Sequence, residues 1–87
     1  MPRISFFYGI AIYIHWEEGR HGRPHFHARY SGHKASVGLD GEVIAGSLPT
    51  RAERLVREWA QMHTDELIAN WERAVRDEPL VPIDPLP

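Results

Sequence analysis

The sequence predicts an α+β fold: an N-terminal antiparallel β-meander of four to five strands, followed by one or two helices packed on one face. Apolar and polar residues alternate with a period of two in the first half, whereas apolar residues recur at helical spacing after residue 49. The length of 87 residues fits a single domain. We divide it into a β-sheet half (1–48), a helical half (49–76) and a proline-rich tail (77–87).

Five segments of the first half have the composition of strands. The expected strands are residues 3–7, 10–16, 25–30, 34–39 and 42–46. Alternation places Ile10, Ile12, Ile14 and Trp16 on the core side, together with Phe26, Ala28 and Tyr30. Asp40-Gly41 is the strongest hairpin signal, because both positions tolerate a positive φ. A hairpin over residues 17–24 would make the second and third strands neighbours.

Helix signals follow in the second half. Thr50 and Glu53 fit a capping box after Pro49. An apolar stripe at helical spacing contains Leu55, Val56, Trp59, Met62, Leu67, Ile68, Trp71 and Val75. We assign its two aromatic members, Trp59 and Trp71, to the core and not to a stacking platform for bases. Thr64-Asp65-Glu66 resembles a second helix start. We therefore expect either two helices that break near His63 or one long bent helix.

The tail has four prolines and cannot be helical. Its apolar residues, Leu80, Val81, Ile83 and Leu86, favour an extended strap packed along the domain, with docking on a partner as the alternative. The chain has no cysteine, which excludes disulfides and thiolate zinc sites. The early apolar stretch lacks a cleavage pattern and is too short and polar to span a bilayer. We expect a cytoplasmic protein without membrane contact, in which a homodimer or a partner adds burial.

Charge is divided between the two halves, although the net charge is only −2. Residues 1–48 carry five basic and four acidic side chains and five of the six histidines, whereas residues 49–87 carry five arginines and eight acids. The net charge argues against a general nucleic-acid coating protein, while the division still allows a local site for an anion.

The segment Pro24-His25-Phe26-His27-Ala28-Arg29-Tyr30 carries the strongest chemical signal. On a strand, His25, His27 and Arg29 share one face and the apolar residues share the other. Imidazole transfers protons near neutral pH, and guanidinium binds phosphate as a fixed fork. An outward strand face that is merely polar is the plainer alternative.

A cluster follows if the second and third strands pair. We predict His25, His27 and Arg29 as catalytic, with one imidazole as base, the other as acid, and a cation holding the phosphate charge. The predicted substrate-binding residues are Tyr13, His15, Arg20, Arg23 and Lys34. No cofactor is expected. The alternative is zinc or another divalent transition metal held by His15, His25 and His27.

Four motifs resemble the bacterial domain-of-unknown-function 4160 family: the opening Met-Pro-Arg-Ile-Ser-Phe-Phe-Tyr-Gly-Ile, Pro-His-Phe-His-Ala-x-Tyr, Gly46-Ser47-Leu48-Pro49 and Asn70-Trp71-Glu72-Arg73-Ala74. The resemblance covers nearly the whole chain. It implies a small cytoplasmic protein from a two-gene module similar to toxin–antitoxin pairs, with a small cognate partner protein. It implies no catalytic residues.

Three hypotheses stay open. The leading one is a toxin-like component that acts on RNA as a metal-independent ribonuclease, through the His25, His27 and Arg29 face. The second is a non-catalytic interaction or repressor partner of such a module, which uses the strand face or the tail. The third is a small His-ligated metal-binding protein or hydrolase.

Overall fold

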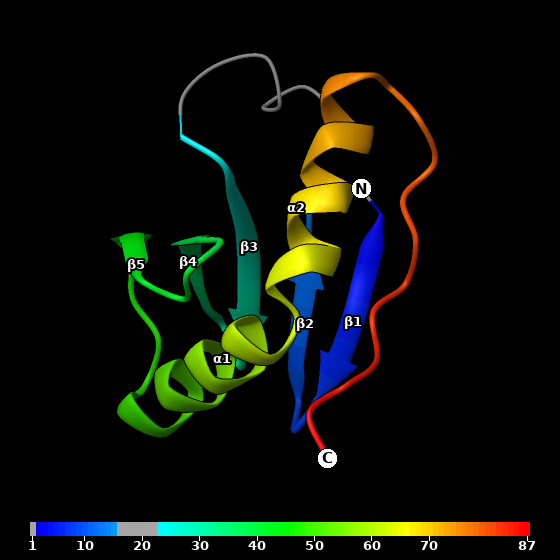
Figure 1. The fold of residues 1–87 in the computed structure, drawn as a ribbon. Helices are drawn as coiled ribbons and strands as arrows, with labels where there is room; N and C mark the ends of the chain where they lie inside the picture. The colour runs from blue at the N-terminus through cyan, green and yellow to red at the C-terminus, as the bar shows by residue number, and fades with distance from the viewer. Residues whose placement is uncertain (1, 16–22) are drawn as a thin grey trace.

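The computed structural model describes residues 2–15 and 23–87 and confirms the predicted α+β fold. Its antiparallel sheet has the order β1-β2-β3-β4-β5, so sequence neighbours are sheet neighbours (Figure 1). The strands are β1 (Arg3–Phe7), β2 (Ile10–Tyr13), β3 (His25–Tyr30), β4 (His33–Gly38) and β5 (Val43–Gly46). Two helices follow, α1 (Thr50–Met62) and α2 (Thr64–Val75).

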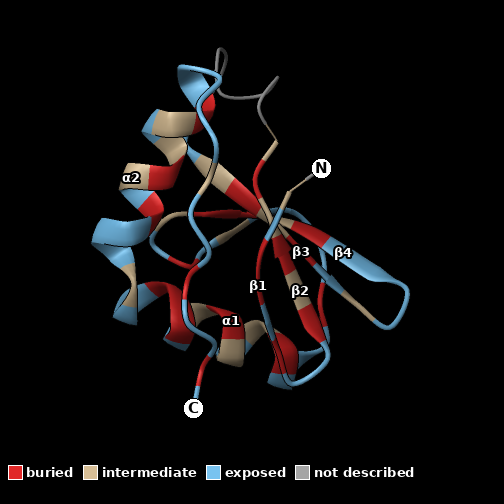
Figure 2. Cartoon of the chain, turned by 90° about the vertical axis from the view of Figure 1, so that its right-hand side faces the viewer, coloured by how far each residue is buried: buried red, intermediate tan, exposed pale blue. Residues whose placement is uncertain are grey.

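Both helices cover one face of the sheet, and the core lies between these two layers (Figures 1 and 2). The predicted inward residues of β2 and β3 are fully buried: Ile10, Ile12, Phe26 and Ala28, with Ile14 just beyond β2. From α1, Trp59 packs its ring 5.2 Å from that of Phe7 and 5.7 Å from that of Phe26. Trp59 is therefore core, whereas Tyr30 and Trp71 are only partly buried. Three other members of the predicted helical stripe, Met62, Ile68 and Val75, are exposed. Trp16 lies outside the described residues.

The element boundaries differ from the prediction in a few places. The second strand ends at Tyr13 instead of Trp16. The chain breaks into two helices at His63, as one of the two alternatives proposed. Thr50 makes no capping hydrogen bond, because Pro49 is the N-cap and its carbonyl accepts from the Glu53 N–H. At the second helix start, His63 is the N-cap and its Nδ1 lies 2.6 Å from the carboxylate of Glu66.

The proline-rich tail is extended and packs on its own chain. The Ile83 N–H donates to the Ile4 carbonyl at 2.8 Å, so the tail runs beside β1 (Figure 1). Trp59 Nε1 donates to the Asp84 carbonyl at 2.8 Å, and Ile83 is buried. The buried side chain of Asn70 on α2 pairs with both backbone groups of Val81. The tail is therefore part of the fold, and any partner that binds the tail would contact it in this packed position.

Candidate functional site

The face of the sheet that turns away from the helices carries the predicted chemical residues; we call it the outer face. Strand pairing defines it, because directly opposed residues project from the same side. Tyr13 pairs with His27, and His27 pairs with Ser36. Arg29 pairs with Lys34 on the same face. The pairing of β2 with β3, on which the predicted cluster depends, is therefore present.

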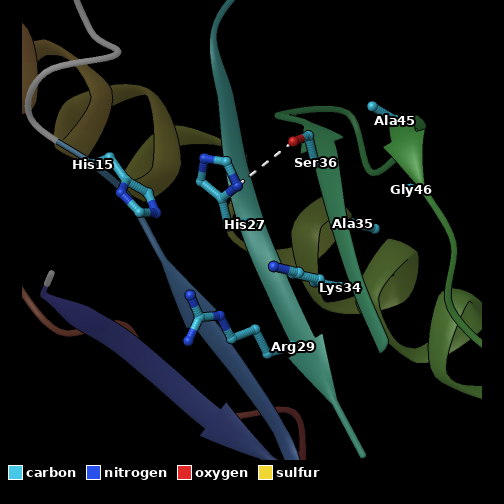
Figure 3. Close-up of a pocket in the computed structure, with 8 residues that line it drawn as sticks. All are labelled: His15, His27, Arg29, Lys34, Ala35, Ser36, Ala45 and Gly46. Carbon is cyan, nitrogen blue, oxygen red and sulfur yellow. Dashed lines mark hydrogen bonds between the residues drawn. The ribbon is translucent and has the colours of Figure 1, made fainter. Parts of the chain in front are cut away.

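Three imidazoles lie in contact at one end of the outer face. The ring of His27 lies 4.2 Å from that of His15 and 5.1 Å from that of His25, both measured between centroids and both edge-to-face. His27 is thus the central member. Its Nδ1 also lies 3.5 Å from the Ser36 hydroxyl, at the long end of the hydrogen-bond range (Figure 3).

His25 has a different environment from His27. Its Nδ1 donates to the Arg23 carbonyl at 2.7 Å, since a carbonyl can only accept. This bond fixes the tautomer, and the lone pair of neutral His25 is therefore on Nε2. Its ring lies 5.4 Å from that of Trp71 on α2, a contact that the sequence did not indicate. These two contacts orient His25 at the end of β3.

Two cations lie beside the imidazoles. Figure 3 shows Arg29 reaching from β3 over β2, and Lys34 reaching from β4 over β3. The guanidinium carbon of Arg29 lies 5.3 Å from the centroid of the Tyr13 ring, within cation–π range. The predicted residues Tyr13, Arg29 and Lys34 are thus brought together with His27.

An open pocket of about 400 Å³ lies over this part of the sheet (Figure 3). Its lining residues are His15, His27, Arg29, Lys34, Ala35, Ser36, Ala45 and Gly46. The residues that β5 contributes, Ala45 and Gly46, are small, and the polar side chains of the lining are all potential hydrogen-bond donors. His25 is not among the described lining residues. The pocket therefore offers two imidazoles, two cations and a hydroxyl to one anion.

The structure does not bring every predicted residue to this pocket. Arg23 turns its side chain toward the β4–β5 turn, where its Nη2 lies 3.5 Å from the carboxylate of Asp40. The backbone of Arg23 still contributes, through the carbonyl that orients His25. Arg20, also predicted to bind substrate, lies outside the described residues, as do the neighbouring residues 16–22.

Arg23→Ala is expected to change the free energy of unfolding by less than about 1 kcal/mol, because exposed ion pairs contribute little. Both side chains of the Arg23–Asp40 pair are 58% exposed. Urea denaturation of the variant beside the wild type measures this. A loss of several kcal/mol would contradict the expectation and assign the guanidinium a structural role.

The metal alternative receives no support from side-chain placement. Among residues 2–15 and 23–87, no group of three or more metal-ligating side chains is arranged to hold an ion. The rings of His15 and His25, two members of the predicted ligand set, each lie edge-to-face against the ring of the third member, His27.

Among the residues that the structure describes, acidic side chains are absent from the strands that form the outer face. None of the five strands contains Asp or Glu. In the described part of the chain, the acids occur in the β4–β5 turn, in the helices and in the tail. In the described residues, the charged side chains of the strands are thus all basic, whereas most of the acids lie in the helices and the tail. This distribution leaves Arg29 and Lys34 without acidic neighbours within the strands.

The sequence of the chain matches a known protein family. The family model of DUF4160, a domain of unknown function, matches residues 9–72. The chain belongs to the DUF4160 family. The matched region runs from the start of β2 to α2 and includes every residue that lines the pocket. The predicted membership of DUF4160 is confirmed over residues 9–72, whereas most of the opening motif precedes the matched region. The family description assigns no activity.

Comparison beyond the family gives no further relatives. No curated protein and no solved structure matches the chain. Within the described residues, neither helix has the length and apolar content that a membrane span requires. The function of this DUF4160 domain must therefore be argued from its own residues.

Proposed function

We propose that this DUF4160 domain cleaves RNA at the outer-face pocket by general acid–base catalysis. The observation that carries the proposal is the placement of the His15–His27 ring pair beside Arg29 and Lys34 around one pocket. Two imidazoles supply a base and an acid near neutral pH, and two cations supply the countercharge for a phosphodiester. This set differs from the sequence prediction, since His15 takes the place of His25 as the partner of His27.

The proposed reaction conserves atoms and charge. One imidazole of the pair removes the proton of a ribose 2′-hydroxyl, and the 2′-oxygen attacks the adjacent phosphorus. The bond from phosphorus to the 5′-oxygen breaks, and the other imidazole, protonated, gives its proton to that oxygen. Arg29 and Lys34 stabilise the charge that develops on the phosphoryl oxygens. The products are a 2′,3′-cyclic phosphate and a 5′-hydroxyl.

His25 supports this reaction as a positioning residue. Its ring touches His27, and its own orientation is fixed by the Arg23 carbonyl and by Trp71. Packing on both sides limits the rotation of His25 and, through it, of the central imidazole. Pre-organisation of this kind removes part of the entropic cost of reaching the transition state.

We place the activity in the setting that the family resemblance implies, a toxin of a cytoplasmic bacterial toxin–antitoxin module with a small partner protein. Expression of the wild type alone is then expected to arrest growth, and co-expression of the adjacent gene product to restore it. Growth without arrest, from cells that accumulate folded protein, would contradict this setting.

The direct test is incubation of purified protein with a labelled RNA oligonucleotide in the presence of a chelator. Cleavage with a 2′,3′-cyclic phosphate end is expected, and an oligonucleotide with a single 2′-deoxyribose at the cleaved position should be resistant. Cleavage that disappears with the chelator, or that leaves a 3′-hydroxyl, would overturn the proposed chemistry.

A further inference from the structure

The outer face extends past the pocket onto β1, and this extension carries aromatic rings and a further cation. We infer that the outer face binds a single strand of RNA, with bases stacked on Phe6 and Tyr13 and phosphates held by Arg3, Arg29 and Lys34. The inference names the substrate class of the proposed site and rests on the proposed function for cleavage. Binding itself needs no cleavage, so the two can be tested apart.

Strand register places Phe6 on the outer face. Phe6 pairs with Ala11, Ala11 pairs with Arg29, and Arg29 pairs with Lys34. One row across four strands therefore leads from an aromatic ring to the two cations of the pocket. The Phe6 side chain is 52% exposed. A single exposed apolar side chain is ordinary on a protein surface, so a binding role for Phe6 must be argued from the residues around it.

A second row runs parallel to the first. Arg3 pairs with Tyr13, Tyr13 pairs with His27, and His27 pairs with Ser36. Tyr13 is half-buried and lies between the β1 cation and the central imidazole. Two aromatic rings, one in each row, thus occupy neighbouring strands on the way to His27.

Each ring has a guanidinium over its face. The guanidinium carbon of Arg3 lies 5.1 Å from the centroid of the Phe6 ring, and that of Arg29 lies 5.3 Å from the centroid of the Tyr13 ring. Unpaired bases stack on aromatic rings and on guanidinium planes alike, and the same guanidinium groups bind phosphate. The paired arrangement therefore fits a chain that alternates flat bases with charged phosphates.

Charge on the outer face complements a polyanion despite the net charge of the protein. The five strands carry Arg3, Arg29 and Lys34 and no acid. The acids of the helices lie in the layer on the opposite side of the sheet (Figure 1). Local potential, and not net charge, governs the encounter of a charged ligand with one face.

The geometry favours a single strand over a duplex or a mononucleotide. Bases in a duplex are stacked on each other and cannot lie on Phe6 or Tyr13. Phe6 and Arg29 are separated by two strand spacings, roughly 10 Å, so a ligand that uses both must extend across the sheet. A flexible single strand of RNA meets both conditions and can place one of its phosphates next to His27.

The test measures binding of a short fluorescent single-stranded RNA whose riboses are all 2′-O-methylated, so that the 2′-oxygen cannot attack. Phe6→Leu keeps apolar area but removes the ring and is expected to weaken binding about tenfold, whereas Phe6→Trp should bind at least as tightly. Ile68→Ala is the matched control, because it shortens an exposed apolar side chain on α2. Circular dichroism verifies that each variant is folded.

Salt dependence provides a second measurement. Three phosphate contacts to a single strand predict that log affinity falls with log salt with a slope of about −2, and Arg3→Gln should reduce its magnitude by about 0.7. Equal affinity for a duplex, or full affinity in folded Phe6→Leu, overturns the inference even if the protein cleaves RNA. Binding with these dependences but without cleavage of unmodified RNA upholds the inference and overturns the proposed function.

Discussion

Asn70→Ala is expected to lower the free energy of unfolding by about 3 kcal/mol, equivalent to a fall in Tm of roughly 10–25 °C at this chain length. Asn70 is fully buried on α2. Its Nδ2 donates to the Val81 carbonyl at 2.8 Å, and its Oδ1 accepts from the Val81 N–H and from Arg73 Nη1, both at 2.9 Å. Alanine removes all three hydrogen bonds and leaves a small cavity in the helix–tail contact.

The effect should extend along the tail. Trp59 and Ile83 are buried, and Trp59 bonds to the Asp84 carbonyl, so release of Val81 exposes a part of the core to water. Limited proteolysis of Asn70→Ala is therefore expected to cut within residues 77–87 before any other described segment. Thermal and urea denaturation measure the stability change itself.

Two further variants separate the amide from its surroundings. Asn70→Asp keeps an acceptor for the Val81 N–H and for Arg73 but loses the donor to the Val81 carbonyl, so an intermediate loss is expected. Ile68→Ala, on the exposed side of the same helix, should cost less than about 1 kcal/mol. If Asn70→Ala resembles Ile68→Ala, the tail does not depend on the amide.

The fold was largely predictable because its signals are local. Alternation in β2 and β3 identified the inward residues, and the turn signals ordered five strands without a crossover. The role of Asn70 was not predictable in this way. A polar residue within an apolar stripe gives no indication of its partner, and that partner is a backbone segment brought close only by the folded tail.

The structure explains why one position of the family motifs, Gly46, is a glycine. Gly46 has a φ of 76°, in the left-handed region, and an added Cβ would collide with the Lys34 carbonyl. Glycine is therefore required where β5 leaves the sheet. The motif in the sequence includes this glycine, but only the structure shows that its backbone lies close to β4.

The sequence predicted which imidazoles and cations form the candidate site but not how all of their side chains are arranged. The period of two placed His27 and Arg29 on one face, and the pairing of β2 with β3 added His15. Two details depend on tertiary contacts and were not foreseen. The side chain of Arg23 turns to Asp40, which is distant in sequence, and His25 contacts Trp71 on α2.

His27→Gln is expected to lower kcat for RNA cleavage by about 10²- to 10⁴-fold, the usual contribution of one acid–base group. Glutamine keeps hydrogen-bonding capacity at the position but cannot transfer protons near neutral pH. Because Arg29 and Lys34 remain, KM should change much less than kcat. A bell-shaped dependence of the wild-type rate on pH, with one limb lost in the variant, would identify the missing group as a proton donor or acceptor.

The matched control for His27→Gln is His33→Gln, which removes an exposed imidazole at the first residue of β4. His33 pairs with Tyr30, so alternation directs it away from the face that carries His27. Full activity is expected for this control, and both variants should retain the Tm of the wild type within a few degrees, because neither His27 nor His33 is buried.

A folded His27→Gln protein with undiminished kcat would show that His27 takes no part in the reaction. If both variants lost the same share of activity, the cause would be a general loss of RNA affinity on removal of an imidazole. In that case KM would rise and kcat would stay the same.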